Sequence, residues 1–404
     1  MINDIAIIGG GIGGVLACIK LNDTKDYKIT IFEKENELLS GPPYCHLHSG
    51  GFLYPLLPLD ECKELLVHSL LFADFFDDCI IKRPTIIAYR RDEPKYNTIS
   101  LLEKCEFIQK EYSRLNNLIL GPTNEYFAVY NKYDMEFCKK NGYLPKNHDS
   151  LSRKKHDIYV TQFWKNLHDI NIIKYPFVSV NEYGINQEKV KYKVNDYFIK
   201  NKNITVYKNY NVNHVEKYNT KWLIDEMRFD YLINSCGYKI DEIRPKLIKD
   251  IPDAFLEMKS SWMIKSKIDI DYIFPEIAII GERSTERGMI QITPHTESNI
   301  FQVHLMTNYS TLFDNNRLLL DESEIIIRTN KTIEEISNVF PIFKNSVYYT
   351  KPMFGIQRIA NVSKEKRADD VTFYNHMYAE IQIVKGISSV FCANKIYNYL
   401  KKLN

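Results

Sequence analysis

Residues 4–35 read DIAIIGGGIGGVLACIKLNDTKDYKITIFEKE, and this stretch decides the fold. The apolar run over residues 5–8 predicts a buried strand, which leads directly into six residues of which five are glycine. A helical pattern over residues 15–21 follows, and a second strand over residues 27–32 ends at Glu33. The stretch therefore predicts a strand, a glycine turn, a helix and a second strand, as in a Rossmann-like α/β domain.

Each glycine of the turn has a different role in binding a dinucleotide. Gly9 permits the tight turn, Gly11 lets the backbone approach a pyrophosphate, and Gly14 lets the helix pack closely on the strand. The helix N-terminus then offers free N–H groups and the positive end of its dipole to the phosphates. The cofactor contacts expected in this unit are Gly9, Gly11, Ile12, Gly13, Gly14, Glu33 and Lys34.

Glu33 makes the glycine pattern more specific. It lies about 20 residues beyond the last glycine, where an acidic residue accepts the ribose hydroxyls of a dinucleotide. A glycine-rich turn in an unrelated α/β domain is the competing interpretation, and it leaves Glu33 unexplained.

Composition narrows the class of protein. The chain has 404 residues, enough for two or three domains, and a net charge of +2, which gives no reason to expect a nucleic-acid or membrane surface. No apolar run reaches the roughly 18 residues that span a bilayer, and Met1 leads almost directly into the first strand, so we expect no signal peptide. The eight cysteines form no CxxC pair, so we expect neither a zinc site nor disulfides, and a cytoplasmic protein with reduced thiols.

Hydrophobic spacing predicts the remaining elements in two groups. Helices are expected over 60–79, 187–200, 331–340 and 388–400, and strands over 85–89, 204–207, 211–215, 222–224 and 229–236. Alternating stretches between residues 260 and 306 predict an antiparallel sheet, and residues 347–358 are expected to be extended. Residues 92–170 give only weak helical patterns.

The order of these pieces resembles the FAD-dependent oxidoreductases of the D-amino-acid oxidase superfamily. The resemblance rests on the N-terminal glycine loop with Glu33 and on four further blocks, which together cover about half of the chain. These blocks are Ser49-Gly50-Gly51-Phe52-Leu53-Tyr54-Pro55, Glu182-Tyr183-Gly184-Ile185-Asn186 with the helix and strand after it, Asp230-Tyr231-Leu232-Ile233-Asn234-Ser235-Cys236-Gly237, and Lys385-Gly386-Ile387-Ser388-Ser389.

The resemblance implies FAD as cofactor and a fold of two parts. A Rossmann-like FAD-binding domain is expected from residues 1–90, 178–245 and 350–404, and an antiparallel-sheet substrate domain from 91–177 and 246–349. The further cofactor contacts that it implies are Ser49, Gly51, Val212, Ser235, Cys236, Gly237, Gly386, Ile387 and Ser388. The last three also have a physical reason, because a helix N-terminus pointing at the N1–O2 edge of the flavin stabilises the negative charge of the reduced form.

Candidates for the substrate side are fewer. A substrate carboxylate favours an arginine, and Arg358 is the first choice because it lies just before the block expected to meet the flavin, with Arg287 second. His295 follows an alternating strand and is a candidate base or hydrogen-bond donor, although a hydrogen-bonded histidine without a catalytic role fits equally. Tyr54 is expected to line the site or to pack as an ordinary aromatic residue.

Two further chemistries are open at Cys45, His46 and His48. A covalent flavin link through one of them is conceivable, whereas a metal is not expected, because the two histidines have no visible third ligand.

The predicted function is oxidation of a C–N or C–O bond in a small polar substrate, such as an amino or hydroxy acid, by hydride transfer to FAD. A flavin-dependent monooxygenase or reductase is the alternative within the same architecture. A protein that retains FAD without turnover is the alternative of another class, because a fold does not fix a function. Substrate identity, electron acceptor and oligomeric state do not follow from the sequence.

Overall fold

The structure is a computed structural model, and it describes most of the chain. The described residues are 2–41, 44–145, 151–249, 254–266, 274–282, 285–295, 299–307, 321–360, 369–375 and 377–404.

A six-stranded sheet carries the glycine turn. Its order is β19-β20-β13-β1-β2-β9, and the pairs from β20 to β9 are parallel, whereas β19 joins antiparallel at the edge. Parallel strands end at one edge of a sheet, so the residues after β1, β2 and β13 lie close together there. The strands are β1 (Asp4–Ile8), β2 (Lys28–Phe32), β9 (Ile204–Tyr207), β13 (Tyr231–Asn234), β19 (Val371–Tyr374) and β20 (Tyr378–Ile381).

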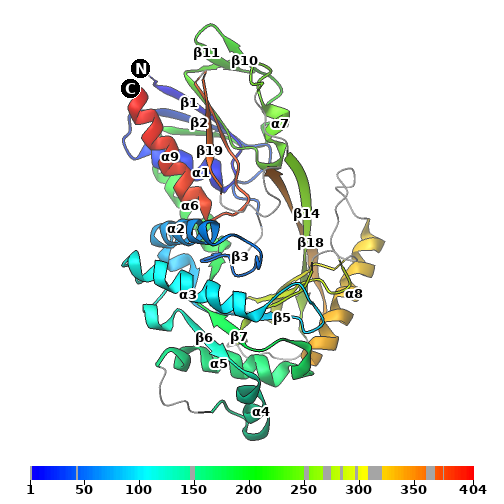
Figure 1. Ribbon diagram of the computed structural model, residues 1–404. Helices are drawn as coiled ribbons and strands as arrows, with labels where there is room; N and C mark the ends of the chain where they lie inside the picture. Colours follow the sequence, from blue (N-terminus) through cyan, green and yellow to red (C-terminus); the bar gives the residue numbers. More distant parts are fainter. Residues whose placement is uncertain are drawn as a thin grey trace.

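Alternation along β1 covers both faces of this sheet. Ile5 and Ile7 are buried in a core with α1 (Ile12–Asn22) and α9 (Ser388–Leu403), whereas Ala6 and Ile8 are buried in a second core. That second core contains Trp222 and lies under a small sheet of β10 (Val215–Tyr218), β11 (Lys221–Ile224) and β12 (Met227–Phe229). Figure 1 shows α1 and α9 beside the parallel strands and the small sheet beyond them.

An eight-stranded sheet forms the other half of the molecule, in the order β18-β14-β17-β16-β15-β5-β7-β6. Its pairs are antiparallel except β15 with β5. Long strands β14 and β18 run from this sheet up to α7 (Ile240–Ile243), beside the parallel sheet (Figure 1). The strands are β5 (Thr85–Tyr89), β6 (Phe127–Tyr130), β7 (Phe177–Val180), β14 (Ala254–Lys265), β15 (Glu276–Ile280), β16 (Ile290–Pro294), β17 (Ile300–Leu305) and β18 (Val347–Ala360).

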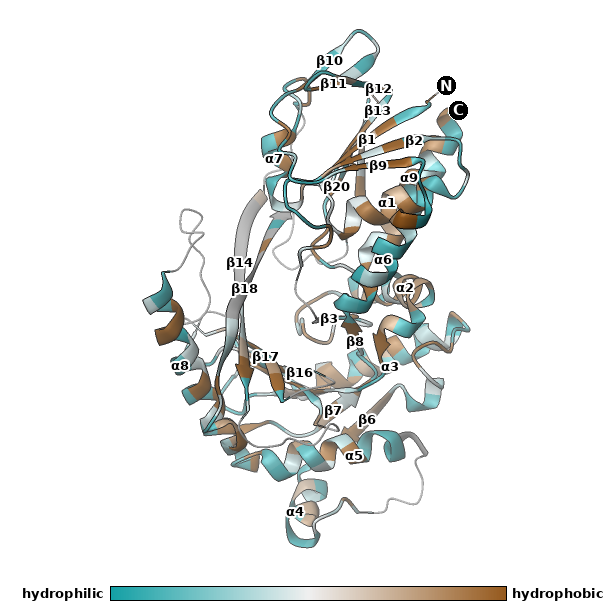
Figure 2. Ribbon diagram, turned by 180° about the vertical axis from the view of Figure 1, so that it is seen from behind, coloured by the Kyte–Doolittle hydropathy of each residue, from teal (hydrophilic) through white to brown (hydrophobic). Residues whose placement is uncertain are grey.

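Helices cover the eight-stranded sheet and close its core. Phe163 of α5 (Leu151–Asn166) is buried with Trp262 of β14 and with Phe340, which follows α8 (Glu322–Val339). In Figure 2, α8 carries both hydrophilic and hydrophobic segments, and brown segments lie on the strands. The other helices are α2 (Leu59–Phe75), α3 (Thr98–Arg114), α4 (Lys132–Asn141) and α6 (Gln187–Lys200), with short 3-10 helices at Asp77–Cys79, Thr123–Glu125, Ile170–Ile172, Gly237–Lys239 and Pro341–Phe343.

A second small sheet joins the two halves. Strand β8 (Gly184–Asn186) pairs antiparallel with β3 (Tyr44–His46) and with β4 (Ile80–Ile81). It fixes the start of the loop that carries His48, Ser49 and Tyr54, because β3 ends at His46.

Most predicted elements are present, with three differences. The antiparallel sheet between residues 260 and 306 is confirmed as β14 to β17, and the predicted C-terminal helix is α9. Residues 211–214 are not a strand, since β10 begins at Val215, and the weak patterns over 92–170 conceal α3, α4 and α5. Strands β5, β7 and β18 belong to the eight-stranded sheet, although they lie wholly or mostly in ranges expected to form the cofactor domain.

Candidate functional site

The glycine turn has the geometry that its sequence predicts. Gly9 has a φ of +105°, a conformation that favours glycine, and a Cβ on Gly14 would overlap the carbonyl oxygen of Gly9. Gly11 is the N-cap of α1 and provides no side-chain hydrogen bond to the helix, and a Cβ on it would meet nothing within 4 Å. The start of α1 therefore opens onto space that no described group of this chain fills next to Gly11.

Glu33 lies against this turn at the end of β2. Its Oε2 accepts a hydrogen bond from the backbone N–H of Gly10 at 2.6 Å, and its Oε1 accepts one from Glu35 at 2.8 Å. A carboxylate has about four acceptor positions, so it retains capacity for the hydroxyls of a ribose. Lys34 points its ammonium to Glu35 at 3.3 Å, in an exposed pair.

The end of β13 closes over the glycine turn. A Cβ on Gly9 would overlap the carbonyl group of Ser235, and the thiol of Cys236 lies 3.4 Å from the carbonyl oxygen of Ile8. Gly237 follows with a φ of +59°. Three predicted contacts, Ser235, Cys236 and Gly237, therefore lie beside the turn although more than 200 residues separate them from it in the sequence.

The segment before α9 reaches the same place from the other side. A Cβ on Gly13 would come within 2.9 Å of the Ile383 side chain, and a Cβ on Gly386 would meet nothing within 4 Å. The backbone N–H groups of Val384 and Lys385 both donate to Asp369 at 2.8 Å, which holds this segment in place. Ser388 has its hydroxyl 3.0 Å from Nδ1 of His68, and Ile387 is buried.

These observations test whether the site fits a dinucleotide. Open space next to Gly11, an uncapped helix start and a carboxylate beside it are what a pyrophosphate and a ribose require. The residues present therefore fit the pyrophosphate–ribose part of FAD.

Val212 lies in the loop between β9 and β10. Its side chain is buried with Phe32 and Trp222, and the nearby Tyr210 donates its backbone N–H to the carbonyl oxygen of Glu33 at 2.9 Å. The loop therefore runs beside the predicted ribose site, and a contact from Val212 to adenine stays a prediction.

The loop after β3 leads toward the eight-stranded sheet. Ser49 donates its hydroxyl to the carbonyl oxygen of Asn181 at 3.0 Å, and Gly51 has a φ of +63°. Tyr54 is buried, with its ring centroid 5.7 Å from that of His48 and 4.9 Å from the ammonium of Lys385. Tyr54 therefore lies between the loop and the segment that precedes α9.

Two buried histidine–glutamate pairs meet at this junction, and we call His46, His48, Glu182 and Glu276 the histidine–glutamate cluster. Nε2 of His46 lies 2.6 Å from Oε1 of Glu276 on β15, and Nδ1 of His48 lies 3.6 Å from Oε1 of Glu182. The two imidazole centroids are 5.5 Å apart. Four titratable side chains are thus gathered where β3 and its loop contact the substrate-side sheet.

Burial controls the protonation of this cluster. It raises the pKa of Glu276, and together with repulsion from Glu276 it raises the pKa of Glu182 to about 8. Burial also holds the pKa of His46 well below its usual value, and the nearby charges of His304 and Lys385 act in the same direction. Each of these pKa shifts favours the neutral form of the side chain concerned. Such strongly shifted pKa values are often found at functional sites.

Arg358 and Arg287, the arginines predicted for the substrate side, bond to other residues of the chain. Arg358 on β18 gives two bonds to the carboxylate of Asp241, at 2.7 and 3.1 Å, and one to Gln382 at 2.7 Å. Its role as a ligand of a substrate carboxylate stays a prediction. In this structure, Asp241 and Gln382 already bond to the guanidinium. Arg287 is exposed and donates to the carbonyl oxygen of Asp92 at 2.8 Å.

His295 follows β16 and lies near Arg83. Burial and the charge of Arg83 lower its pKa to about 4, so it is neutral near pH 7. Its backbone N–H donates to the carbonyl oxygen of Ile300, the first residue of β17. A role for His295 as base or donor stays a prediction.

A covalent flavin link and a metal site are the other two chemistries considered from the sequence. Cys45 is a partly buried, unpaired thiol whose pKa burial raises, which disfavours the thiolate that a covalent link would need. No group of three or more metal-ligating side chains is found within the described ranges.

Sequence reasoning missed the two glutamates and the buried lysine. Glu276 is the one charged residue in Phe274-Pro275-Glu276-Ile277-Ala278-Ile279-Ile280, and an acid at the start of an apolar strand is a signal that marks it. Glu182 and Lys385 lie within the blocks of resemblance, but only the fold brings them near the histidines.

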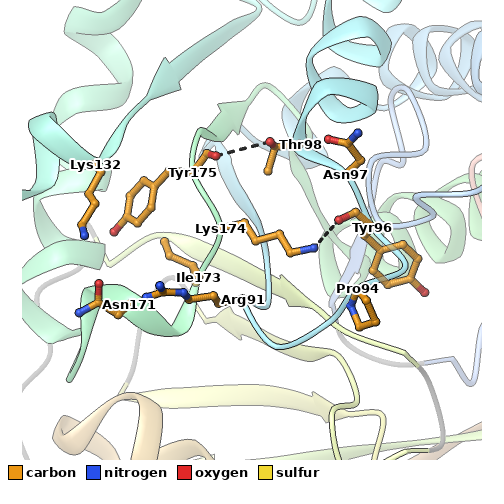
Figure 3. A pocket seen from close by; sticks show the side chains of 10 residues that line it. All are labelled: Arg91, Pro94, Tyr96, Asn97, Thr98, Lys132, Asn171, Ile173, Lys174 and Tyr175. Carbon is orange, nitrogen blue, oxygen red and sulfur yellow. Dashed lines mark hydrogen bonds between the residues drawn. The ribbon is translucent and has the colours of Figure 1, made fainter.

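A separate hollow of about 490 Å³ lies in the substrate half, where the start of α3 meets the loop after β5 (Figure 3). Lys174 points across it and donates to the carbonyl oxygen of Tyr96 at 2.6 Å. Arg91 and Lys132 also line it, and none of its lining residues belongs to the glycine turn or to the histidine–glutamate cluster.

Comparisons of sequence and of structure give different results. No protein-family model and no curated protein sequence matches the chain. Solved structures do match: glycine oxidase from Geobacillus kaustophilus (TM-score 0.64, 10% identity, 99% of this chain and 94% of that one) and L-amino acid deaminase from Proteus vulgaris (TM-score 0.65, 11% identity, 99% and 94%).

L-alpha-glycerophosphate oxidase from Mycoplasma pneumoniae, solved with FAD bound, is similar at a TM-score of 0.63 and 11% identity, over 99% of this chain and 94% of that chain. No helix among the described residues is long and apolar enough to cross a membrane. The resemblance predicted from the sequence is confirmed at the level of the fold, which this chain shares with the glycine oxidase, the L-amino acid deaminase and the glycerophosphate oxidase.

Proposed function

We propose that the chain is an FAD-dependent oxidoreductase that oxidises a C–N or C–O bond of a small polar substrate. The observation that carries the proposal is the open cradle at Gly11, enclosed by Glu33, by the end of β13 and by the segment before α9. When bound, FAD supplies the acceptor for two electrons and a hydrogen from the substrate carbon.

The geometry of the cradle supports a set of residues that would hold FAD. The start of α1 binds the pyrophosphate, and Glu33 accepts the ribose hydroxyls. Gly386 leaves room for a close backbone approach to the flavin, and the uncapped start of α9 favours negative charge there. The predicted contacts of Ser49, Gly51, Val212 and Ser388 belong to the same proposal.

The substrate class is proposed as amino acids and related small amines, with hydroxy acids second. The names of the similar structures, glycine oxidase and L-amino acid deaminase, support amines, and the glycerophosphate oxidase supports an alcohol. A small substrate is favoured because Glu182 and Glu276 are fully buried, so protein atoms already surround the polar groups of the site. The eight unpaired cysteines support a reduced, cytoplasmic setting.

Anaerobic reduction of the FAD-loaded protein tests the proposal. We expect glycine, L-proline or glycerol 3-phosphate, added in turn, to bleach the oxidised flavin spectrum without a nicotinamide cofactor. Reduction only by NADH or NADPH would instead favour a monooxygenase or reductase. A protein that keeps FAD and is reduced by none of these would favour a cofactor-retaining protein without turnover.

A further inference from the structure

His46 is the member of the histidine–glutamate cluster with an open nitrogen. Its Nε2 lies 2.6 Å from Glu276, whereas its Nδ1 has no hydrogen-bond partner within the described part of the chain. The His46 side chain is 9% exposed, and that of Glu276 is 1% exposed. A buried imidazole nitrogen without a partner costs free energy, so its retention points to a ligand or a reacting group.

The surrounding strands fix the orientation of this imidazole. Thr293 on β16 donates its hydroxyl to Oε1 of Glu276 at 3.1 Å, and the side-chain amide nitrogen of Gln291 hydrogen-bonds Glu276 and lies against Nε2 of His46. With Glu276 ionised, Nε2 keeps its hydrogen and donates it to the carboxylate, which leaves the lone pair on Nδ1. The strands thus present Nδ1 as a proton acceptor.

An ionised Glu276 opposes the burial and the nearby charges that hold the pKa of His46 well below its usual value. Neutral His46 with ionised Glu276 carries a net negative charge in a buried site, and uptake of one proton at Nδ1 makes the pair neutral. The neighbouring charged or titratable groups are Cys45 on the same strand and, from other parts of the fold, His48, Arg83, Lys104, Glu182, His304 and Lys385.

We propose that His46, oriented by Glu276, takes up the proton that the substrate's amine or hydroxyl group gives up during oxidation. This inference rests on the proposed function, and it assigns the acid–base role to a residue on the cofactor side of the junction. His46 lies at the end of β3, immediately before the loop of Ser49 and Tyr54, and it contacts β15 and β16 of the opposite sheet. It is therefore at the boundary where substrate and flavin are proposed to meet.

The proton and electron count closes for an amine. An amine arrives as an ammonium, one N–H bond breaks, the proton binds Nδ1 of His46, and the electron pair stays on nitrogen. The C–H bond then breaks, its hydrogen leaves with both electrons to the FAD of the proposed function, and the nitrogen lone pair forms the C=N bond. For an alcohol, the O–H proton goes to His46 as the C=O bond forms.

Nitrogen NMR of FAD-loaded protein labelled with 15N-histidine tests the acceptor directly, without turnover. His46→Asn identifies the signals of His46 by their loss. We expect an unprotonated Nδ1 and a protonated Nε2 near neutral pH, and a change to imidazolium on acidification that shifts in Glu276→Gln. A hydrogen on Nδ1 near neutral pH would overturn the proposal.

Anaerobic flavin reduction by glycine, L-proline and glycerol 3-phosphate gives the second measurement. His46→Asn and the isosteric Glu276→Gln should slow reduction about a hundredfold or more and steepen its rise with pH, as loss of a general base does. The matched controls are His156→Asn and Glu93→Gln, which change a buried histidine and a buried glutamate outside the cluster. In both controls, the flavin should be reduced at the wild-type rate.

Equal rates in His46→Asn and wild type would contradict the proposal. Reduction of wild type by none of the three compounds would count against the proposed function, and the NMR result would then decide the role of His46 by itself.

Discussion

Gly11→Ala is expected to separate cofactor binding from folding. Gly11 has a φ of −70°, which alanine adopts without strain, and its Cβ would meet nothing within 4 Å. Without FAD, the variant should therefore fold about as well as the wild type, because a gain of about 0.4–1 kcal/mol from the reduced freedom of the unfolded chain is offset by the lower preference of alanine for the N-cap position.

The same methyl group occupies the space that a pyrophosphate must enter. A hydrogen bond to a charged group contributes about 1.5–3 kcal/mol, so losing one such bond should raise the Kd for FAD about ten- to a hundredfold. Titration of the apoprotein with FAD, followed by flavin fluorescence, measures the Kd, and urea unfolding of the same apoprotein measures stability.

Gly14→Ala is the contrasting variant. Its Cβ would overlap the carbonyl oxygen of Gly9, which forces α1 away from β1, so we expect a loss of stability of about 1–3 kcal/mol even without FAD. A Gly11→Ala protein that binds FAD with unchanged Kd would refute the assignment of the cradle, because the methyl group would then stand in space that the cofactor does not use.

Three further substitutions test other parts of the account. Glu33→Ala should weaken FAD binding about tenfold or more, since it removes the acceptor of the ribose hydroxyls, and an unchanged Kd in the same titration would place that acceptor elsewhere. If Arg358 binds a substrate carboxylate, Arg358→Lys should lower kcat/KM about a hundredfold at normal FAD content; a normal kcat/KM with a lower Tm would assign Arg358 to its bonds with Asp241 alone. Burial raises the pKa of Glu182 from 4.5 to about 8, so the folded protein keeps a proton that the unfolded chain loses, and stability falls as pH rises through this window. In Glu182→Gln, the free energy of unfolding should fall less steeply with pH, by about 1.4 kcal/mol per pH unit. Urea unfolding between about pH 6 and about pH 8 measures this slope. A slope equal to that of the wild type would show that Glu182 ionises freely.

The cofactor half could be predicted from the sequence because its determinants are local. A buried strand, a glycine turn and a helix occupy consecutive residues, and only glycine fits the φ of +105° at position 9 and the close helix contact at position 14. The meeting of Ser235 with Gly9 followed from resemblance, since their distance in sequence gives no periodic signal.

The substrate half was less predictable, because its contacts depend on tertiary packing. Helix α5 carries scattered polar residues, and it is stabilised by burying Phe163 under the eight-stranded sheet. The His46–Glu276 pair joins residues 230 positions apart on different sheets, so no local pattern announces it. The choice of Arg358 rests on its position just before the block expected to meet the flavin, whereas its partner Asp241 lies far from it in the sequence.

The central claim is that this chain holds FAD and that a small amine or alcohol reduces it. The most direct measurement is anaerobic stopped-flow spectroscopy of the purified protein, after its flavin has been extracted from a sample and identified. The account predicts a yellow protein with one FAD per chain, reduced by at least one of glycine, L-proline and glycerol 3-phosphate. A colourless protein that binds no added FAD would contradict it.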